Sequence, residues 1–168
     1  MSPNPPSFLL PYLEKYPIQA GALLTTIYDL TLSVGWIDTR LTDLGGWVAL
    51  IGHKTKSDPL RAVIPLPIHT TSLKPSSLKS IFNALSSLSL ENLPQPSEKL
   101  APTMDDLKLT IQEQSGTNHN VNDQTIQAEE GSILDQETIY TSIVTPDSTV
   151  VYYKISRGIK KPNDIPDE

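Results

Sequence analysis

A stretch of 47 residues, from position 91 to 137, cannot form a core, and it separates two parts of the sequence that can. It holds ten acidic residues against two lysines, and it contains no aromatic residue. Such a composition offers too little apolar surface to offset the entropy lost on ordering. We therefore predict a disordered insertion here. An acidic arm that docks on a basic partner is the alternative, although charged blocks are more often simply solvated.

The remaining sequence is sufficient for one domain. The chain has 168 residues, 38% of them hydrophobic, and we expect a single domain over residues 7–162, interrupted by 91–137, with tails at 1–6 and 163–168. The net charge of −6 comes from the acidic block, because the rest of the chain carries eleven basic and nine acidic residues. Cysteine is absent, which excludes disulfides and thiolate chemistry. No apolar run is long enough for a membrane span, so we expect no membrane insertion.

The periodicity of the apolar residues predicts helices and strands in a definite order. A short helical turn in SFLLPYLEKY precedes an amphipathic helix over Ile18 to Leu32 that ends before Gly35. Two short strands follow, joined by a hairpin turn at Gly45 and Gly46.

The second half of the pattern completes a sheet. AVIPLPI reads as an extended segment whose Pro65 and Pro67 restrict it to an edge or a strand end. Ser76 and Ser77 are expected to cap a helix with an apolar stripe, and TIYTSIVTPDSTVVYYKIS is expected to form a hairpin that turns at Pro146 and Asp147. The order α, β, β, β, α, β, β predicts an α/β (α+β) fold, a mixed sheet with flanking helices.

The last strand, STVVYYKISRG, has apolar residues on both of its faces. Val151, Tyr153 and Ile155 point one way, whereas Val150, Tyr152 and Lys154 point the other way. We expect the Val151 row to lie in the core and the Val150 row to be an interface, because tyrosine favours interfaces and the last strand is expected at an edge. The alternative is that helices cover both faces.

Familiar catalytic patterns are missing from the sequence. It has no phosphate-binding glycine loop, and His53, His69 and His119 are scattered. Asp147 and Lys154 imitate the spacing of a metal-dependent nuclease, but Tyr152 stands where the second carboxylate ligand should be. We therefore expect no bound metal, no cofactor and no catalytic residue.

The hairpin TIYTSIVTPDSTVVYYKISRG resembles the C-terminal signature of the small, non-catalytic subunit of the eukaryotic tRNA-splicing endonuclease. Weaker similarities lie in IYDLTLSVGW, WVALIGHK, VIPLPI and the Leu78 to Leu88 helix. The resemblance covers residues 7–90 and 138–162 and fails over the acidic block. It implies the C-terminal domain fold of the tRNA-intron endonucleases, which is a mixed sheet with flanking helices.

The resemblance also implies partners. This family works in a heterotetramer of two catalytic and two structural subunits that excises introns from precursor tRNA. Separately from the resemblance, the apolar edge strand predicts that the isolated chain can form a homodimer. The resemblance implies that the protein is located in the nucleus or, as in some fungi, on the mitochondrial outer surface. The residues expected at the interface are Asp147, Val150, Tyr152, Tyr153 and Lys154, and the candidate RNA phosphate contacts are Arg157, Lys160 and Lys161.

A second function stays open at this point. The chain would be a self-sufficient, metal-independent ribonuclease acting on structured RNA if His69, Lys154 and a tyrosine formed one site.

Overall fold

The computed structural model describes residues 4–70, 73–97, 100, 108, 111 and 133–158. The first half of the described chain contains η1 (Ser7–Leu9), α1 (Leu10–Lys15), α2 (Ala20–Tyr28), η2 (Asp29–Val34), β1 (Ile37–Leu44), β2 (Trp47–His53) and β3 (Leu60–Pro67). The second half contains α3 (Pro75–Ser87), η3 (Leu90–Asn92), β4 (Leu134–Val144) and β5 (Val150–Ser156). The order of helices and strands agrees with the order predicted from the periodicity.

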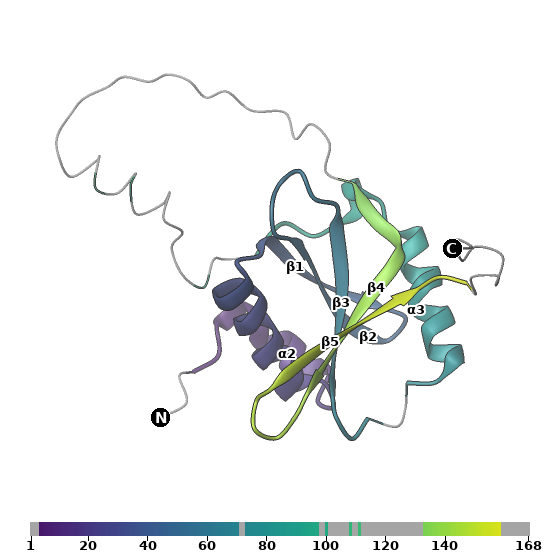
Figure 1. Ribbon diagram of the computed structural model, residues 1–168, viewed down its shortest axis with the longest axis horizontal. Helices are drawn as coiled ribbons and strands as arrows, with labels where there is room; N and C mark the ends of the chain where they lie inside the picture. Colours follow the sequence, from purple (N-terminus) through teal and green to yellow (C-terminus); the bar gives the residue numbers. More distant parts are fainter. Residues whose placement is uncertain are drawn as a thin grey trace, which may run out of the picture.

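The described strands form one five-stranded sheet in the order β1-β2-β3-β4-β5. β3 and β4 are parallel, and every other neighbouring pair is antiparallel. Helix α2 lies against one face of the sheet and α3 against the other, to the left and right of the sheet in Figure 1. The predicted α+β fold, a mixed sheet with flanking helices, is confirmed.

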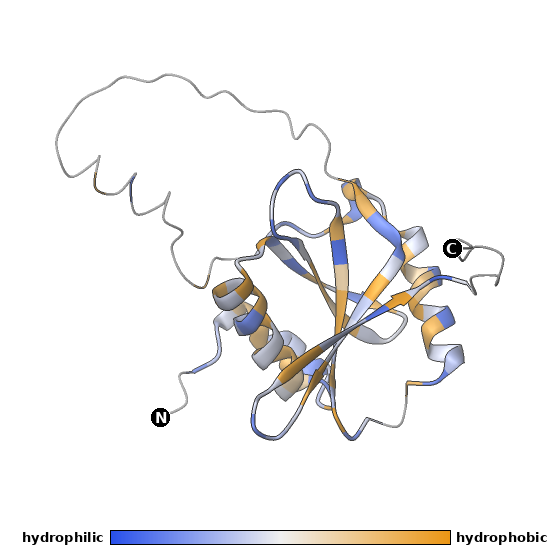
Figure 2. Cartoon of the chain, viewed as in Figure 1, coloured by the Kyte–Doolittle hydropathy of each residue, from blue (hydrophilic) through white to orange (hydrophobic). Residues whose placement is uncertain are grey.

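Each face of the sheet has its own core. The α3-side core joins Ile81, Phe82 and Leu85 to the sheet, and the α2-side core does the same with Leu23 and Ile27. β2 and β3 are therefore apolar on both sides, which is the pattern of strands covered by helices above and below. Figure 2 shows this concentration of hydrophobic residues on the strands between the helices.

Glycines set two of the chain's turns as expected. Gly45 and Gly46 have φ of 63° and 90° and form the two-residue hairpin between β1 and β2. Gly35, with φ of 86°, ends the helix that began at Ala20. The last turns of that helix, Asp29–Val34, are a π-helix, which the periodicity did not predict.

The predicted start of the second long helix is corrected. α3 begins at Pro75, with Lys74 as a cap that makes no side-chain hydrogen bond, so the predicted serine caps are wrong. Proline suits the first helical position because its missing N–H has no partner to lose there.

The ends of the predicted insertion belong to the fold. Leu93 and Leu134 lie in the α3-side core, and β4 already begins at Leu134, so 91–137 was drawn too widely. Apart from 100, 108 and 111, positions 98–132 of that block lie outside the described residues, as do positions 1–3 and 159–168. Its disorder therefore stays a prediction.

Pro65 is also placed by the structure. β3 is the central strand, so the edge alternative is wrong, but Pro65 and Pro67 do lie at the end of β3. The pairing of β2 with β3 runs from Leu50–Val63 to Gly52–Arg61 and stops before Pro65.

Candidate functional site: the free edge of the sheet

β5 is an edge strand, as its position at the end of the sequence predicted. It pairs with β4 from Val144–Val150 to Thr138–Ser156 without a register shift. Thr145 N–H donates to Thr149 O at 3.0 Å, and Arg157 N–H donates to Glu137 O at 2.7 Å. Because hydrogen-bonded pairs alternate in an antiparallel ladder, the backbone groups of the even-numbered residues from Val150 to Ser156 point away from β4. These groups form the free edge.

The turn before β5 contains Pro146 and Asp147, as predicted. Ser148 N–H donates to Thr145 O at 2.9 Å. The Asp147 carboxylate accepts hydrogen bonds from the Thr145 hydroxyl and, at 3.2 Å, from Thr149 N–H. These hydrogen bonds lower the pKa of Asp147. The exposed carboxylate thus stabilises its own turn, and its predicted interface role stays untested.

The two tyrosines of β5 have opposite environments. Tyr152 packs against the α2-side core, and its hydroxyl donates to the Asp29 carboxylate at the start of the π-helix. Burial, followed by this hydrogen bond and the negative charge of Asp29, raises the pKa of Tyr152. Tyr153 points to the other face and is 57% exposed.

The predicted assignment of the two rows is therefore reversed at its centre. Val151, at 41%, is exposed like Tyr153, whereas Val150 and Tyr152 in the other row are half-buried. Ile155 alone follows the prediction, because it packs against the α3-side core. α3 does not extend over Val151 and Tyr153, which leaves an apolar strip beside the free edge. The start of this strand is hydrophobic in Figure 2.

The far end of β5 carries basic residues. Lys154 is exposed and pairs with Tyr140 across the ladder. Arg157 is exposed as well, and its guanidinium donates to Ser86 Oγ at 2.7 Å near the end of α3. Lys160 and Lys161 lie outside the described residues.

The groups required for a ribonuclease site are far apart. His69 lines a pocket of about 300 Å³ together with Val144, Thr145 and Pro146. Lys154 lies opposite Tyr140, four residues before Val144 on β4. At about 3.3 Å per residue, this separates the two side chains by roughly 13 Å along the strand.

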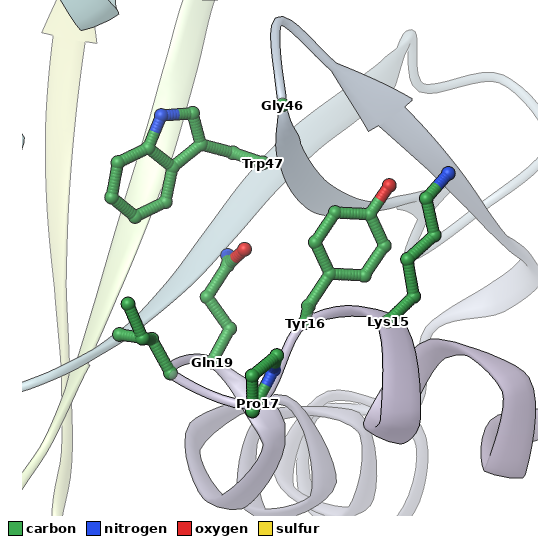
Figure 3. Close-up of a pocket in the computed structure, with 7 residues that line it drawn as sticks. Lys15, Tyr16, Pro17, Gln19, Gly46 and Trp47 are labelled. Atoms are coloured by element: carbon green, nitrogen blue, oxygen red, sulfur yellow. The ribbon is translucent and has the colours of Figure 1, made fainter.

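A second pocket, of about 350 Å³, lies where the connection from α1 to α2 meets the β1–β2 turn (Figure 3). Tyr16 and Trp47 form its aromatic walls, and Gln19 extends between them. The Tyr16 hydroxyl donates to the Asp43 carboxylate, and the Gln19 amide bonds to backbone groups of the sheet. These polar groups therefore already hydrogen-bond within the fold. None of the residues predicted at a functional site lines this pocket.

Within the residues that the structure describes, no group of three His, Asp or Glu side chains is arranged to hold a metal ion. None of the helices in the described ranges is long and apolar enough to span a bilayer. The predicted absence of a cofactor stays a prediction.

Sequence reasoning missed Asp29 as a partner of Tyr152. The two residues are 123 positions apart, so no local pattern connects them. The only signal available was that Asp29 is the one charged residue in the helical stretch from Ile18 to Leu32.

The described part of the chain therefore forms an α+β domain that presents one open sheet edge and keeps its candidate acid–base groups apart. Residues 90–166 match the family model described as Sen15 protein, and Sen15 is the small subunit of the tRNA-splicing endonuclease. The match agrees with the resemblance of the hairpin to this family, and it covers 77 of the 168 residues. The match does not extend to residues 1–89. No curated protein matches the chain.

Proposed function

We propose that this chain is a non-catalytic, structural subunit of the tRNA-splicing endonuclease, which pairs through β5 with a catalytic subunit and supports intron excision from precursor tRNA. The family match supports membership of the complex. The observation that carries the pairing is the uncovered edge of β5, with Val151 and Tyr153 exposed beside it.

Pairing would occur by strand addition. The outward backbone groups of Val150, Tyr152, Lys154 and Ser156 would hydrogen-bond to a strand of the partner. Val151 and Tyr153 would add apolar contact on the α3 side, where exposed tyrosine is typical of interfaces. The main chain would supply affinity and the side chains specificity.

The non-catalytic part of the proposal is supported by the separation of His69 from Lys154. A general base contributes only within hydrogen-bond reach of the proton it removes, which is far shorter than their roughly 13 Å spacing along the strand. Tyr152 is committed to Asp29 and is a poor third member of such a site.

The assembly would be a heterotetramer in the nucleus or on the mitochondrial outer surface. Precursor tRNA would bind to the assembled complex and not to this chain alone. Arg157 would add phosphate attraction that salt screens. The isolated chain should therefore bind precursor tRNA weakly at physiological salt. Cell fractionation with a tagged chain would locate the assembly.

Co-purification with a catalytic subunit tests the pairing. Lys154→Pro removes an N–H that points to the free edge, so it should weaken pairing by about tenfold or more without costing a bond to β4. Lys154→Ala is the matched control, because it keeps that N–H and should pair normally. Equal pairing by both variants would place the interface elsewhere.

Incubation of the purified chain with intron-containing precursor tRNA in EDTA tests the ribonuclease alternative. We expect no cleavage without a partner subunit. Cleavage that disappears in His69→Ala would establish the alternative instead.

A further inference from the structure

The sheet has a second edge, β1, and two of its outward carbonyl groups, those of Thr39 and Leu41, accept hydrogen bonds. The β1–β2 register from Leu44–Trp47 to Arg40–Ile51 places the backbone groups of Leu41 on the outer side of β1, and Thr39 follows just beyond the last pair of this run. Ser97 N–H donates to Thr39 O at 2.7 Å. The Tyr12 hydroxyl donates to Leu41 O over a longer 3.4 Å. Two separate segments thus bond to alternating positions of the same edge.

The next outward position toward the turn, Asp43, is contacted as well. The Tyr16 hydroxyl donates to the Asp43 carboxylate, so the connection after α1 lies against this end of β1. Tyr16 is 8% exposed and belongs to the α2-side core. At the opposite end, the register of β1 shifts between Ile37 and Arg40. Such an irregularity interrupts a flat edge.

The residues around Ser97 are anchored on both faces of the sheet. Leu93 lies in the α3-side core and is 7% exposed. Leu100 packs against the α2-side core. Leu93 and Leu100 therefore lie on opposite faces of the sheet, and Ser97, between them in the sequence, bonds to Thr39 on the β1 edge.

We infer that Tyr12, Tyr16, Leu93, Ser97 and Leu100 form an edge clasp that closes β1 to strand addition, so that the sheet accepts a partner strand at β5 only. Among the described residues, no comparable hydrogen bond reaches the outward backbone groups of β5. An open edge at each end would let copies or partners add in series, whereas one closed edge stops the assembly after one addition. The β5 half of this inference rests on the proposed function, whereas the closure of β1 does not.

The test opens β1 while β5 is blocked. In a Lys154→Pro background, the double change Ser97→Pro and Tyr12→Phe removes both donors to the β1 carbonyls. We expect concentration-dependent self-association in sedimentation velocity, with at least a doubling of the weight-average mass. Ser97→Ala with Tyr12 intact, in the same background, keeps the Ser97 N–H and should stay monomeric. A monomeric triple variant that retains the circular dichroism of the folded chain would overturn the clasp.

Hydrogen exchange on the unchanged protein gives a measurement that does not depend on the variants folding. The Ser97 amide should exchange at least about tenfold more slowly than an unstructured amide, because its hydrogen bond must open first. Exchange of Ser97 at the unstructured rate would overturn the clasp. Pairing with a catalytic subunit is measured separately, so loss of the β5 proposal would leave this result unchanged.

Discussion

Gln19 replaces backbone hydrogen bonds that β2 and β3 do not make with each other. The antiparallel register would place Val48 opposite Pro65, which has no N–H to donate. The Gln19 amide donates to Val48 O at 3.1 Å and to Pro65 O at 3.0 Å, and its oxygen accepts from Val48 N–H at 2.9 Å. One buried side chain thus satisfies three buried backbone groups, which explains how a proline fits within the central strand.

Gln19→Ala should therefore be strongly destabilising. It leaves these backbone groups without partners, and at roughly 1–3 kcal/mol per unsatisfied buried group we expect a loss of about 3 kcal/mol or more. Chemical denaturation measures the change in the free energy of unfolding. Thr25→Ala is the control, because Thr25 lies on the same helix with an exposed hydrogen bond to Gly21 O. A loss below about 0.5 kcal/mol for Gln19→Ala would contradict this account.

Tyr152 gives a prediction about pH. Its pKa is raised in the folded protein by burial, by the hydrogen bond to Asp29 and by the charge of Asp29. Because the pKa of Tyr152 is higher in the folded protein than in the unfolded chain, where it is near 10, its contribution to the free energy of unfolding is fully present below about pH 10. This contribution is lost as the pH rises further. Tyr152→Phe should be about 1 kcal/mol less stable than the unchanged protein at pH 7.

The difference between these two proteins should shrink above about pH 10. Tyr16, whose pKa is also raised, contributes equally to both proteins and cancels in the comparison. Thermal melts between pH 7 and 11 measure the difference, and Tyr153→Phe serves as the exposed control. A difference that stays constant across this range would show that the Tyr152–Asp29 bond is not responsible.

At the scale of the element, β5 is a strand with two unequal faces. Tyr152 and Tyr153 are adjacent and identical in chemistry, yet one packs on the α2-side core and the other is exposed. The difference arises because α2 and its π-helix reach β5, whereas α3 covers only the Ile155 end of the opposite face.

Paired aspartate substitutions separate the two faces of β5. Tyr152→Asp places a second carboxylate beside Asp29 in a half-buried position and should destabilise the fold by about 2–4 kcal/mol. Tyr153→Asp should change stability by less than about 1 kcal/mol and weaken partner binding. Circular dichroism melts and co-purification measure the two effects. Equal destabilisation by both substitutions would mean that both faces of β5 are core.

At the scale of the whole molecule, a long connection joins η3 to β4, and both of its ends are anchored in one core. Leu93, just after η3, and Leu134, the first residue of β4, both lie in the α3-side core. The two parts of the chain are thus joined by packing and by the parallel pairing of β3 with β4, in addition to the covalent link.

Deletion of residues 112–130 should leave the free energy of unfolding within about 1 kcal/mol of its original value. Closure entropy varies only logarithmically with loop length, so shortening a flexible connection stabilises the fold slightly. Denaturant unfolding measures the effect, and a glycine–serine replacement of the same length is the control. A loss of several kcal/mol from both changes would show that this stretch packs on the core.

The sequence by itself determined the features that depend on neighbouring residues. Gly45 and Gly46 could be assigned to a hairpin because a two-residue turn requires positive φ, and Gly35 to a helix end for the same reason. Pro146 and Asp147 could be assigned to a turn because their side chains favour that local conformation. The period of two also separated the rows of β5 correctly, although it could not say which row the helices cover.

Only the tertiary structure decided which surfaces meet. Strand periodicity gives two rows, but when both are apolar the choice between them depends on where α2 and α3 pack. Gln19 lies 46 positions from Pro65, and Ser97 bonds to Thr39 across a similar distance, so neither contact leaves a mark in the adjacent sequence. These contacts form because buried backbone groups require partners from whichever segment the fold brings close, and that requirement carries no periodic signal.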